Sequence, residues 1–376
     1  MPLFLDVHSL GDPVTLDDVK QAHDADLRTQ GPHGVDYVRY WVDEAAGKIF
    51  CLVEAPSANV AAEVHREAHG LVAQEIYRVT EGGTHMSVDD ESAPAEHAEF
   101  APLEAWDAIA AGYAQHVAPG EQSLSAAALG LVGLTPGETF LDIAAGPGGL
   151  GLSAARLGAT VLATDWAPQM VAQFESRARS EGLADASARV MDAHALDLED
   201  NTFDVTGSQF GVMLVPDQAL ALREMVRVTK PGGRVLLIAY GSPAEFDALQ
   251  FFVAALQTVA PDFAGLPDPP PLEFQGADPD ILRERLVAAG LRDVRVDTTQ
   301  QERLELSTGQ EAWDWMVFSN PITEMILDDV GVSEADRARM RTALERMIRD
   351  RANADGVAVL TASLNIGWGR KPDRRP

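Results

Sequence analysis

Along the first 81 residues, apolar and polar positions alternate with the short periods of a small sheet accompanied by two helices. Two segments of helical period begin near Thr15 and Ser57, whose hydroxyl groups can accept the first free backbone N–H groups of a helix. Between and around these helices the pattern changes to a two-residue period, which is typical of strands. The strands predicted in this way cover residues 3–8, 35–42, 49–54 and 75–79.

The order of these elements, β-α-β-β-α-β, predicts a small ferredoxin-like α+β domain over residues 1–81. Its two helices can cover only one face of the sheet. We expect the other face to carry Tyr37, Tyr40 and Trp41, and to pair with a second copy of the chain in a homodimer.

A second, larger domain is predicted over residues 101–376. Residues 82–100 have no apolar period and many small and acidic residues, so we expect a flexible acidic linker there. Beyond it strands alternate with helices, which predicts a parallel α/β sheet. The strands expected there cover residues 139–145, 160–165, 188–192, 203–209 and 234–240, with late strands at 294–299 and 360–368 around a helical insertion at about 301–355.

The acidic surplus narrows the possible partners. The sequence has 58 Asp and Glu against 29 Lys and Arg, a formal net charge of −29. Nucleic acids and anionic membranes attract clustered basic residues, so we expect neither to bind this chain. No apolar run approaches the roughly 20 residues of a membrane span. The N-terminus resembles no leader segment. Cys51 is the single cysteine of the sequence and cannot form an internal disulfide. These features predict a cytoplasmic protein.

The strongest chemical motif is a glycine-rich turn between a strand and a helix. Residues 140–149 read Phe-Leu-Asp-Ile-Ala-Ala-Gly-Pro-Gly-Gly, and two later strands end near Asp165 and Asp192. Parallel strands end at one edge of the sheet, where open α/β folds bind ligands. Any one acid could merely cap a helix, but three in register predict a nucleoside site. Asp165 would accept from the ribose hydroxyls and Asp192 from an adenine amine.

Asp142 discriminates between two nucleoside ligands. A carboxylate four residues before Gly146 would repel the pyrophosphate of a dinucleotide. The same carboxylate suits a ligand with an amine and a sulfonium, which favours S-adenosylmethionine over NAD. An NAD enzyme remains an alternative, which tight NADH binding would support.

Residues 106–240 resemble the class I S-adenosylmethionine-dependent methyltransferases, nearest to those of menaquinone and ubiquinone biosynthesis. The matching stretches are residues 142–149, 163–170, 191–196, 203–205 and 223–234. The resemblance implies a Rossmann-like sheet and methyl transfer, although Ala144 stands where the family often has glycine. It implies cofactor contacts from Tyr113, Asp142, Ala144, Gly146, Gly148, Asp165, Trp166, Met170, Asp192, Ala193 and Gln209.

The methyl acceptor is expected to be a small organic molecule. Residues 207–211 read Gly-Ser-Gln-Phe-Gly and lack the Asn/Asp-Pro-Pro-aromatic turn of enzymes that methylate base amines. One cysteine cannot supply the thiolates of arsenic methylation. A general base is needed only if the acceptor loses a proton, and we assign no catalytic residue. Trp313, Trp315 and Phe318 either shape the acceptor site or form core.

Three histidines of the first domain suggest a metal site. His65 and His69 are four residues apart on one helix face, a spacing that can chelate a metal, and His8 ends the first strand at the same edge of the fold. Helix-end charge or core filling is the alternative, and the spacing does not choose among Ni²⁺, Zn²⁺ and Cu²⁺. Residues 1–81 also resemble a family of small nickel-binding ferredoxin-like proteins, in stretches 6–8, 37–41, 50–56 and 64–70. That resemblance implies nickel and a dimer.

Together these observations predict a metal-binding ferredoxin-like domain fused to a class I methyltransferase that acts on a small molecule. The alternative is a metal-responsive binding protein that holds S-adenosylmethionine without turnover. Formation of a methylated product would separate the two.

Overall fold

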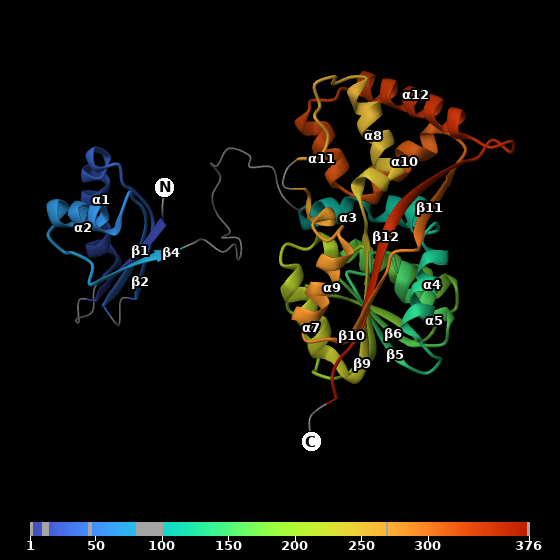
Figure 1. Ribbon diagram of the computed structural model, residues 1–376, viewed down its shortest axis with the longest axis horizontal. Helices are drawn as coiled ribbons and strands as arrows, with labels where there is room; N and C mark the ends of the chain where they lie inside the picture. Colours follow the sequence, from blue (N-terminus) through green and yellow to red (C-terminus); the bar gives the residue numbers. More distant parts are fainter. Residues whose placement is uncertain (1–2, 10–14, 44–46, 80–100, 268–269, 374–376) are drawn as a thin grey trace. The chain divides into compact units, whose positions relative to one another are not determined.

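The computed structural model describes residues 3–9, 15–43, 47–79, 101–267 and 270–373. The chain divides into two compact units, Met1–Glu91 and Ser92–Pro376, both drawn in Figure 1. The linker predicted at 82–100 lies outside the described residues. None of the helices described in these ranges combines the length and the apolar character that a membrane crossing requires.

The N-terminal unit follows the predicted β-α-β-β-α-β order. Its elements are β1 (Leu3–Ser9), α1 (Leu16–Thr29), η1 (Gly31–His33), β2 (Asp36–Asp43), β3 (Lys48–Glu54), α2 (Ala58–Ala68) and β4 (Glu75–Val79). The strands form one antiparallel sheet in the order β2-β3-β1-β4, and both helices lie on one face of it (Figure 1). Ser57 begins α2 as expected, because its Oγ accepts the N–H of Val60 at 3.4 Å.

The expectation that Tyr37 lies on the open face of this sheet is wrong. The pairing of β2 with β3 shifts register between Tyr37 and Arg39, and Tyr37 turns toward the helices. Its side chain is 4% exposed, and its hydroxyl donates to the carbonyl of Ala61 at 3.1 Å. Tyr40 packs against the same core, whereas Trp41 is 47% exposed. The strand irregularity, which the two-residue period did not reveal, decides which aromatic residues face solvent.

The C-terminal unit is built on a large mixed sheet. Its strands are β5 (Thr139–Ile143), β6 (Thr160–Asp165), β7 (Ala186–Val190), β8 (Phe203–Gln209), β9 (Thr229–Tyr240), β10 (Arg292–Asp297), β11 (Gln301–Leu306) and β12 (Ala358–Arg370). The order is β10-β12-β9-β8-β5-β6-β7, with β5 to β9 parallel and β12 antiparallel to both of its neighbours. The predicted Rossmann-like sheet is therefore confirmed.

Helices cover both faces of this sheet. Side chains of α4, α5 and α6 pack into one core cluster and those of α7 and α9 into another. The helices are α3 (Leu103–Gly112), η2 (Tyr113–Val117, a π-helix), α4 (Gln122–Val132), α5 (Gly149–Arg156), α6 (Pro168–Ser180), η3 (Val212–Leu214), α7 (Gln218–Val228), η4 (Pro243–Glu245), α8 (Asp247–Gln257), η5 (Leu272–Phe274), α9 (Pro279–Ala288), α10 (Gly309–Ser319), α11 (Ile322–Asp329) and α12 (Glu334–Arg351).

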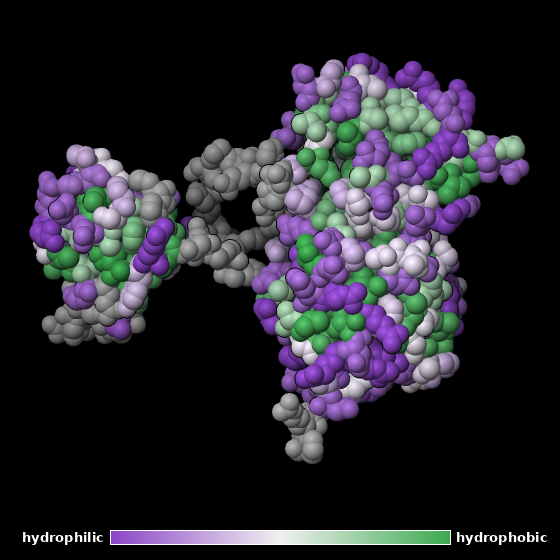
Figure 2. Space-filling model, viewed as in Figure 1, coloured by the Kyte–Doolittle hydropathy of each residue, from purple (hydrophilic) through white to green (hydrophobic). Residues whose placement is uncertain are grey.

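A cap stands at one end of the sheet, formed by α8, α10, α11, α12, β11 and the first half of β12 (Figure 1). Trp313 and Trp315 are buried in the core of the cap, and Phe318 packs against that core. Figure 2 shows hydrophilic side chains over the outer face of the cap along α12. The start of the predicted helical insertion is a strand instead, because residues 301–306 bury every second position against β12.

Candidate functional site

The glycine-rich turn joins β5 to α5 in a backbone shape that excludes most side chains. Ala144, Gly146 and Gly148 all have positive φ, at 50°, 52° and 93°. A Cβ on Gly148 would also lie 2.4 Å from the ring of Phe174. The left-handed φ of Ala144 explains why glycine suits that position. The N–H groups of Ala145, Gly146 and Gly148 already donate within the chain, so the turn mainly lets a ligand approach the backbone closely at this edge of the sheet.

Asp142, at the end of β5, is a fully buried carboxylate with one free oxygen. Its Oδ2 accepts the N–H of Gly151 at 2.7 Å, while Oδ1 is buried and accepts no hydrogen bond from any described residue. Burial raises the pKa of Asp142 to about 8, and the nearby Asp165 and Glu121 add to this rise. A buried oxygen without a donor is costly, so the site lacks a group that a ligand could supply.

Asp165, at the end of β6, ties two loops of the site together. Its Oδ2 accepts the N–H of Gly146 at 2.8 Å and its Oδ1 that of Ala167 at 2.9 Å. Burial raises its pKa to about 6 although these hydrogen bonds oppose the rise. A carboxylate has further lone pairs, so the ribose contact expected of Asp165 stays a prediction.

Glu121, just before α4, is a site residue that the sequence did not reveal. It is buried, accepts the hydroxyl of Tyr113 at 2.7 Å, and burial raises its pKa. A Cβ on Gly149 would lie 2.5 Å from Glu121 Oε2, so the carboxylate sits directly against the glycine-rich turn. Acids are common at helix starts, which is why Glu121 drew no attention in the sequence.

Gln209 lies where expected, at the last position of β8 beside the turn. Its Oε1 accepts the hydroxyl of Ser125 at 2.8 Å, and its Nε2 is buried without an acceptor among the described residues. The next residue, Phe210, has a positive φ of 60°. A bulky side chain in that conformation is strained, and such strain is concentrated at functional sites.

The residues expected around the adenine divide into two groups. Met170 is buried with Trp166 in a small cluster that also contains Ile109 of α3. Asp192 lies beyond the end of β7, with its side chain half exposed, and its Oδ1 accepts the backbone N–H of His194 at 2.8 Å. Ala193 is buried.

This edge of the sheet gathers buried negative charge without its own counter-charge. Glu121, Asp142, Asp165 and Glu302 of β11 are all buried, and burial raises the pKa of each. Within the described part of the chain none of them forms a salt bridge, and Arg177 acts only at a distance on Glu121. Buried like charges are unfavourable unless protons or a cation neutralise them. The site therefore has the electrostatics of a receptor for a cation.

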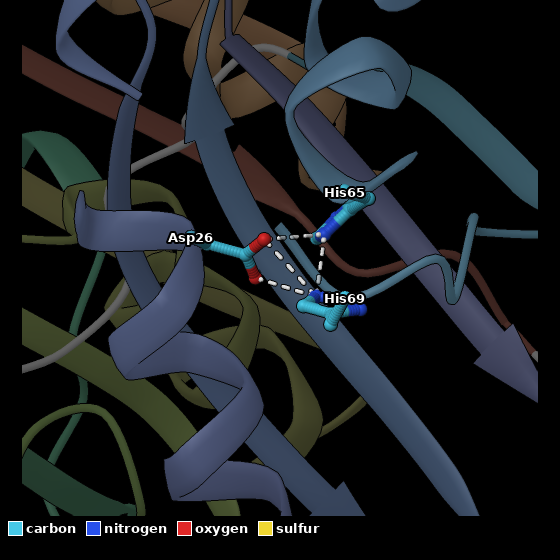
Figure 3. Close-up of side chains that lie close together, drawn as sticks. All are labelled: Asp26, His65 and His69. Carbon is cyan, nitrogen blue, oxygen red and sulfur yellow. Dashed lines mark hydrogen bonds and ion pairs between the residues drawn. The ribbon is translucent and has the colours of Figure 1, made fainter. Parts of the chain in front are cut away.

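The N-terminal unit contains a second polar cluster, drawn in Figure 3. His65 Nδ1 lies 3.1 Å from Asp26 Oδ1, His69 Nε2 lies 3.2 Å from Asp26 Oδ2, and the two imidazole nitrogens are 3.4 Å apart. The potential ligand atoms of these three residues all lie within 4.8 Å of one another. The helix pair predicted from the sequence is thus joined by a carboxylate of α1 that the prediction omitted.

His8 lies near this group but outside it. Its ring meets that of His65 edge-on, with centroids 4.7 Å apart, and burial, together with the two other histidines, lowers its pKa to about 4. The other nitrogen of His65 lies 3.1 Å from Asp6 Oδ2. Burial alone would lower the pKa of His65, but the hydrogen bonds of Asp26 and Asp6 outweigh it and raise the pKa to about 9. The inward position of Asp6, between Phe4 and His8 on β1, was a signal in the sequence.

Both units match known families. Residues 4–79 match the family model described as nickel responsive protein SCO4226-like, and residues 141–237 match that of a methyltransferase domain. A demethylmenaquinone methyltransferase of Mycolicibacterium gilvum is 33% identical over 170 residues, which cover 43% of this chain and 72% of the relative.

Two further proteins are similar to parts of this chain. An uncharacterised protein of Mycobacterium tuberculosis is 34% identical over 176 residues, which cover 45% of this chain and 62% of the relative. The chain thus spans less than two thirds of that relative's length. The crystal structure of SCO4226 from Streptomyces coelicolor is 40% identical, covering 22% of this chain and 99% of that one, with a TM-score of 0.21.

Proposed function

The chain belongs to the class I S-adenosylmethionine-dependent methyltransferases, and we propose that it methylates a small organic molecule in the cytoplasm. Its N-terminal domain belongs to the SCO4226-like nickel responsive family. The observation that supports the proposal most is Asp142 Oδ1, a buried acceptor without a donor beside the glycine-rich turn. An amine or sulfonium would supply the missing positive charge.

The residues present fit S-adenosylmethionine, which supplies a methyl group activated by a sulfonium. Asp142 and Glu121 would face its cationic end, and Asp165 would accept from the ribose hydroxyls. Trp166, Met170, Asp192 and Ala193 would line the adenine. The task of these residues is to hold the reactants in line and to exclude water, because the methyl carbon needs no further activation.

Calorimetric titration with S-adenosylmethionine tests this function. We expect Asp142→Asn to weaken binding at least about tenfold, since the amide cannot neutralise a cation. Asp197→Asn, an exposed acid beyond the end of β7, is the matched control and should bind as wild type does. Equal affinity in Asp142→Asn would contradict the role of Asp142. A protein that binds the donor but forms no S-adenosylhomocysteine with any acceptor would instead be the binding protein without turnover.

The N-terminal unit is proposed to bind a transition metal, with nickel tried first. Two imidazoles and a carboxylate are a donor set that suits Ni²⁺, Zn²⁺ or Cu²⁺. Asp26, His65 and His69 would hold the ion, and Asp6 Oδ1, buried without a hydrogen bond from the described residues, supports a further ligand or orienting group nearby. His8 stays a prediction. His65 would have to release a carboxylate contact, since both of its nitrogens are engaged.

Nickel titration of the full chain tests the metal site. The double variant His65→Ala, His69→Ala should lose binding, whereas His33→Ala, whose partner is the exposed Glu67, should keep it. Nickel binding as tight as that of wild type in the double variant would refute the site.

A homodimer through the open sheet face is also proposed, supported by the exposed Val38, Trp41 and Tyr77, and sedimentation of Trp41→Glu would test it.

A further inference from the structure

Glu302 is a buried carboxylate of the cap that none of the cofactor contacts uses. We infer that Glu302 is the general base of the reaction, and that it removes a proton from a flat aromatic acceptor whose reacting group is an O–H or N–H. This inference rests on the proposed methyl transfer, and it names the chemical class of the acceptor.

The geometry of Glu302 leaves one oxygen for a ligand. It is 7% exposed, on β11, and its Oε2 accepts the hydroxyl of Tyr240 at 3.0 Å. Its Oε1 accepts no hydrogen bond from the described residues. On the neighbouring strand Glu302 pairs with Ala362, which in turn bridges to Phe246. One carboxylate oxygen is thus fixed by the protein, and the other is left for a donor.

Glu302 belongs to the same electrostatic network as the cofactor turn. The charge of Glu121 acts on Glu302, the charge of Glu302 acts on Tyr113, and Glu121 sits against Gly149. Tyr240, which donates to Glu302, stacks on Phe210, the residue after Gln209, so the cap brings this carboxylate to the edge where Gln209 and the glycine-rich turn lie. A base must be within reach of the reacting atom, and this is the side of the turn that the cap covers.

Aromatic side chains pack around the ring of Tyr240. The ring of Tyr240 stacks on Phe210 and on Phe246, each at 4.5 Å between centroids, and Trp315 meets Phe246 edge-on at 6.2 Å. Phe210 has a positive φ of 60°, a strained backbone conformation for a bulky residue. Tyr240 and Phe246 are only partly buried, and such ring faces favour a flat, apolar ligand, so Glu302 places a carboxylate beside an aromatic surface.

The ionisation of Glu302 is suited to proton transfer near neutral pH. Burial raises its pKa to about 8, the charge of Glu121 adds to the rise, and the hydrogen bond from Tyr240 opposes it. The titratable groups that face it are Tyr240 from β9, Tyr113 from η2 and Glu121 ahead of α4. A base is most effective when its pKa lies near the working pH.

The step balances without any other reactant. The acceptor's oxygen or nitrogen gives its proton to Glu302 Oε1 and forms a bond to the methyl carbon. The carbon–sulfur bond breaks, and its electron pair stays on sulfur, so the sulfonium becomes a neutral thioether. Glu302 ends as a neutral acid and loses its proton to solvent when the product leaves.

A binding experiment tests the inference without turnover. The full chain, saturated with S-adenosylhomocysteine, is titrated with two probe pairs: a naphthol with its methyl ether, and a naphthylmethylamine with naphthylmethanol. We expect wild type to bind either the naphthol or the naphthylmethylamine at least about tenfold more tightly than the other member of its pair. A preference for the naphthol indicates an O–H acceptor, and a preference for the amine indicates an N–H acceptor. Glu302→Gln should abolish this preference, and Glu305→Gln, an exposed acid on the same strand, should keep it.

A pH profile then distinguishes a base from a structural residue. With the preferred probe, wild-type kcat should rise tenfold per pH unit below the pKa of Glu302 and then level off. Glu302→Gln should lose this dependence and about a hundredfold or more of kcat. Tyr240→Phe should shift the rise to higher pH, because the lost hydrogen bond had lowered the pKa.

Two results would overturn the inference: no preference within either probe pair in wild type, or a preference and a pH profile that survive in Glu302→Gln. Failure of the proposed function is a different observation, in which wild type binds neither S-adenosylmethionine nor S-adenosylhomocysteine, and the assignment of Glu302 would then fall with it.

Discussion

The two units of this protein bury carboxylates in opposite ways. In the N-terminal unit Asp6 and Asp26 enclose His65, whose raised pKa makes it their internal cation. At the sheet edge of the C-terminal unit Asp142 and Glu121 have no such partner among the described residues. The first arrangement contains a cation of its own, and the second requires protons or a ligand. Buried charge without a counter-charge therefore indicates a ligand by itself, whereas in the N-terminal unit the metal is indicated by the arrangement of the donor atoms.

The largest effect is expected when the internal cation is removed. His65→Ala leaves Asp6 buried without this partner and Asp26 with only His69, which should cost about 3–5 kcal/mol of unfolding free energy. Urea unfolding of the metal-free full chain, followed through the N-terminal transition, measures it. His33→Ala, at an exposed pair, is the control. A loss below about 1 kcal/mol would mean that the carboxylates do not depend on His65.

The pH dependence of stability should reveal the unpaired carboxylates. The pKa values of Asp142 and Glu302 are raised to about 8 in the folded chain, so unfolding releases protons above about pH 4. Stability of the C-terminal unit should thus fall as pH rises from about 4 to about 8, by up to about 1.4 kcal/mol per unit for each group. Thermal unfolding without ligand measures this, and Asp142→Asn should flatten the slope. A slope unchanged by that variant would show that Asp142 is not the group responsible.

A smaller effect is expected from a single methyl group at the turn. Gly149→Ala places a Cβ 2.5 Å from Glu121 Oε2, and the flexible carboxylate can move aside. The protein should stay folded but bind S-adenosylmethionine about tenfold more weakly, equivalent to about 1.4 kcal/mol. Gly130→Ala, where a Cβ meets nothing within 4 Å, is the matched control. Unchanged affinity would separate Glu121 from the ligand site.

The smallest effect concerns the N-terminal sheet. Tyr37→Phe removes the hydrogen bond to Ala61 and leaves that carbonyl without this donor, which should cost about 1 kcal/mol. Equilibrium unfolding measures the change. If Tyr37 lay on the open face instead, the substitution would leave stability unaffected.

The spacing of apolar residues and the residues at strand ends predicted most of the fold. β6 (Thr160–Asp165) and β8 (Phe203–Gln209) have the predicted bounds, because each stands between clear breaks in period. The side that Tyr37 faces could not be predicted, since a register shift in β2 reverses it. Glu121 and Glu302 could not be predicted either. They reach the site only through tertiary packing of α4 and the cap, which leaves no local pattern.

The most direct test of the central claim is a crystal structure of the full chain with S-adenosylmethionine. We expect the nucleoside to lie across the ends of β5 and β6, with a positively charged or N–H group of the ligand within hydrogen-bond distance of Asp142 Oδ1. A ligand bound elsewhere, or one that leaves Asp142 Oδ1 buried and unpaired, would contradict it.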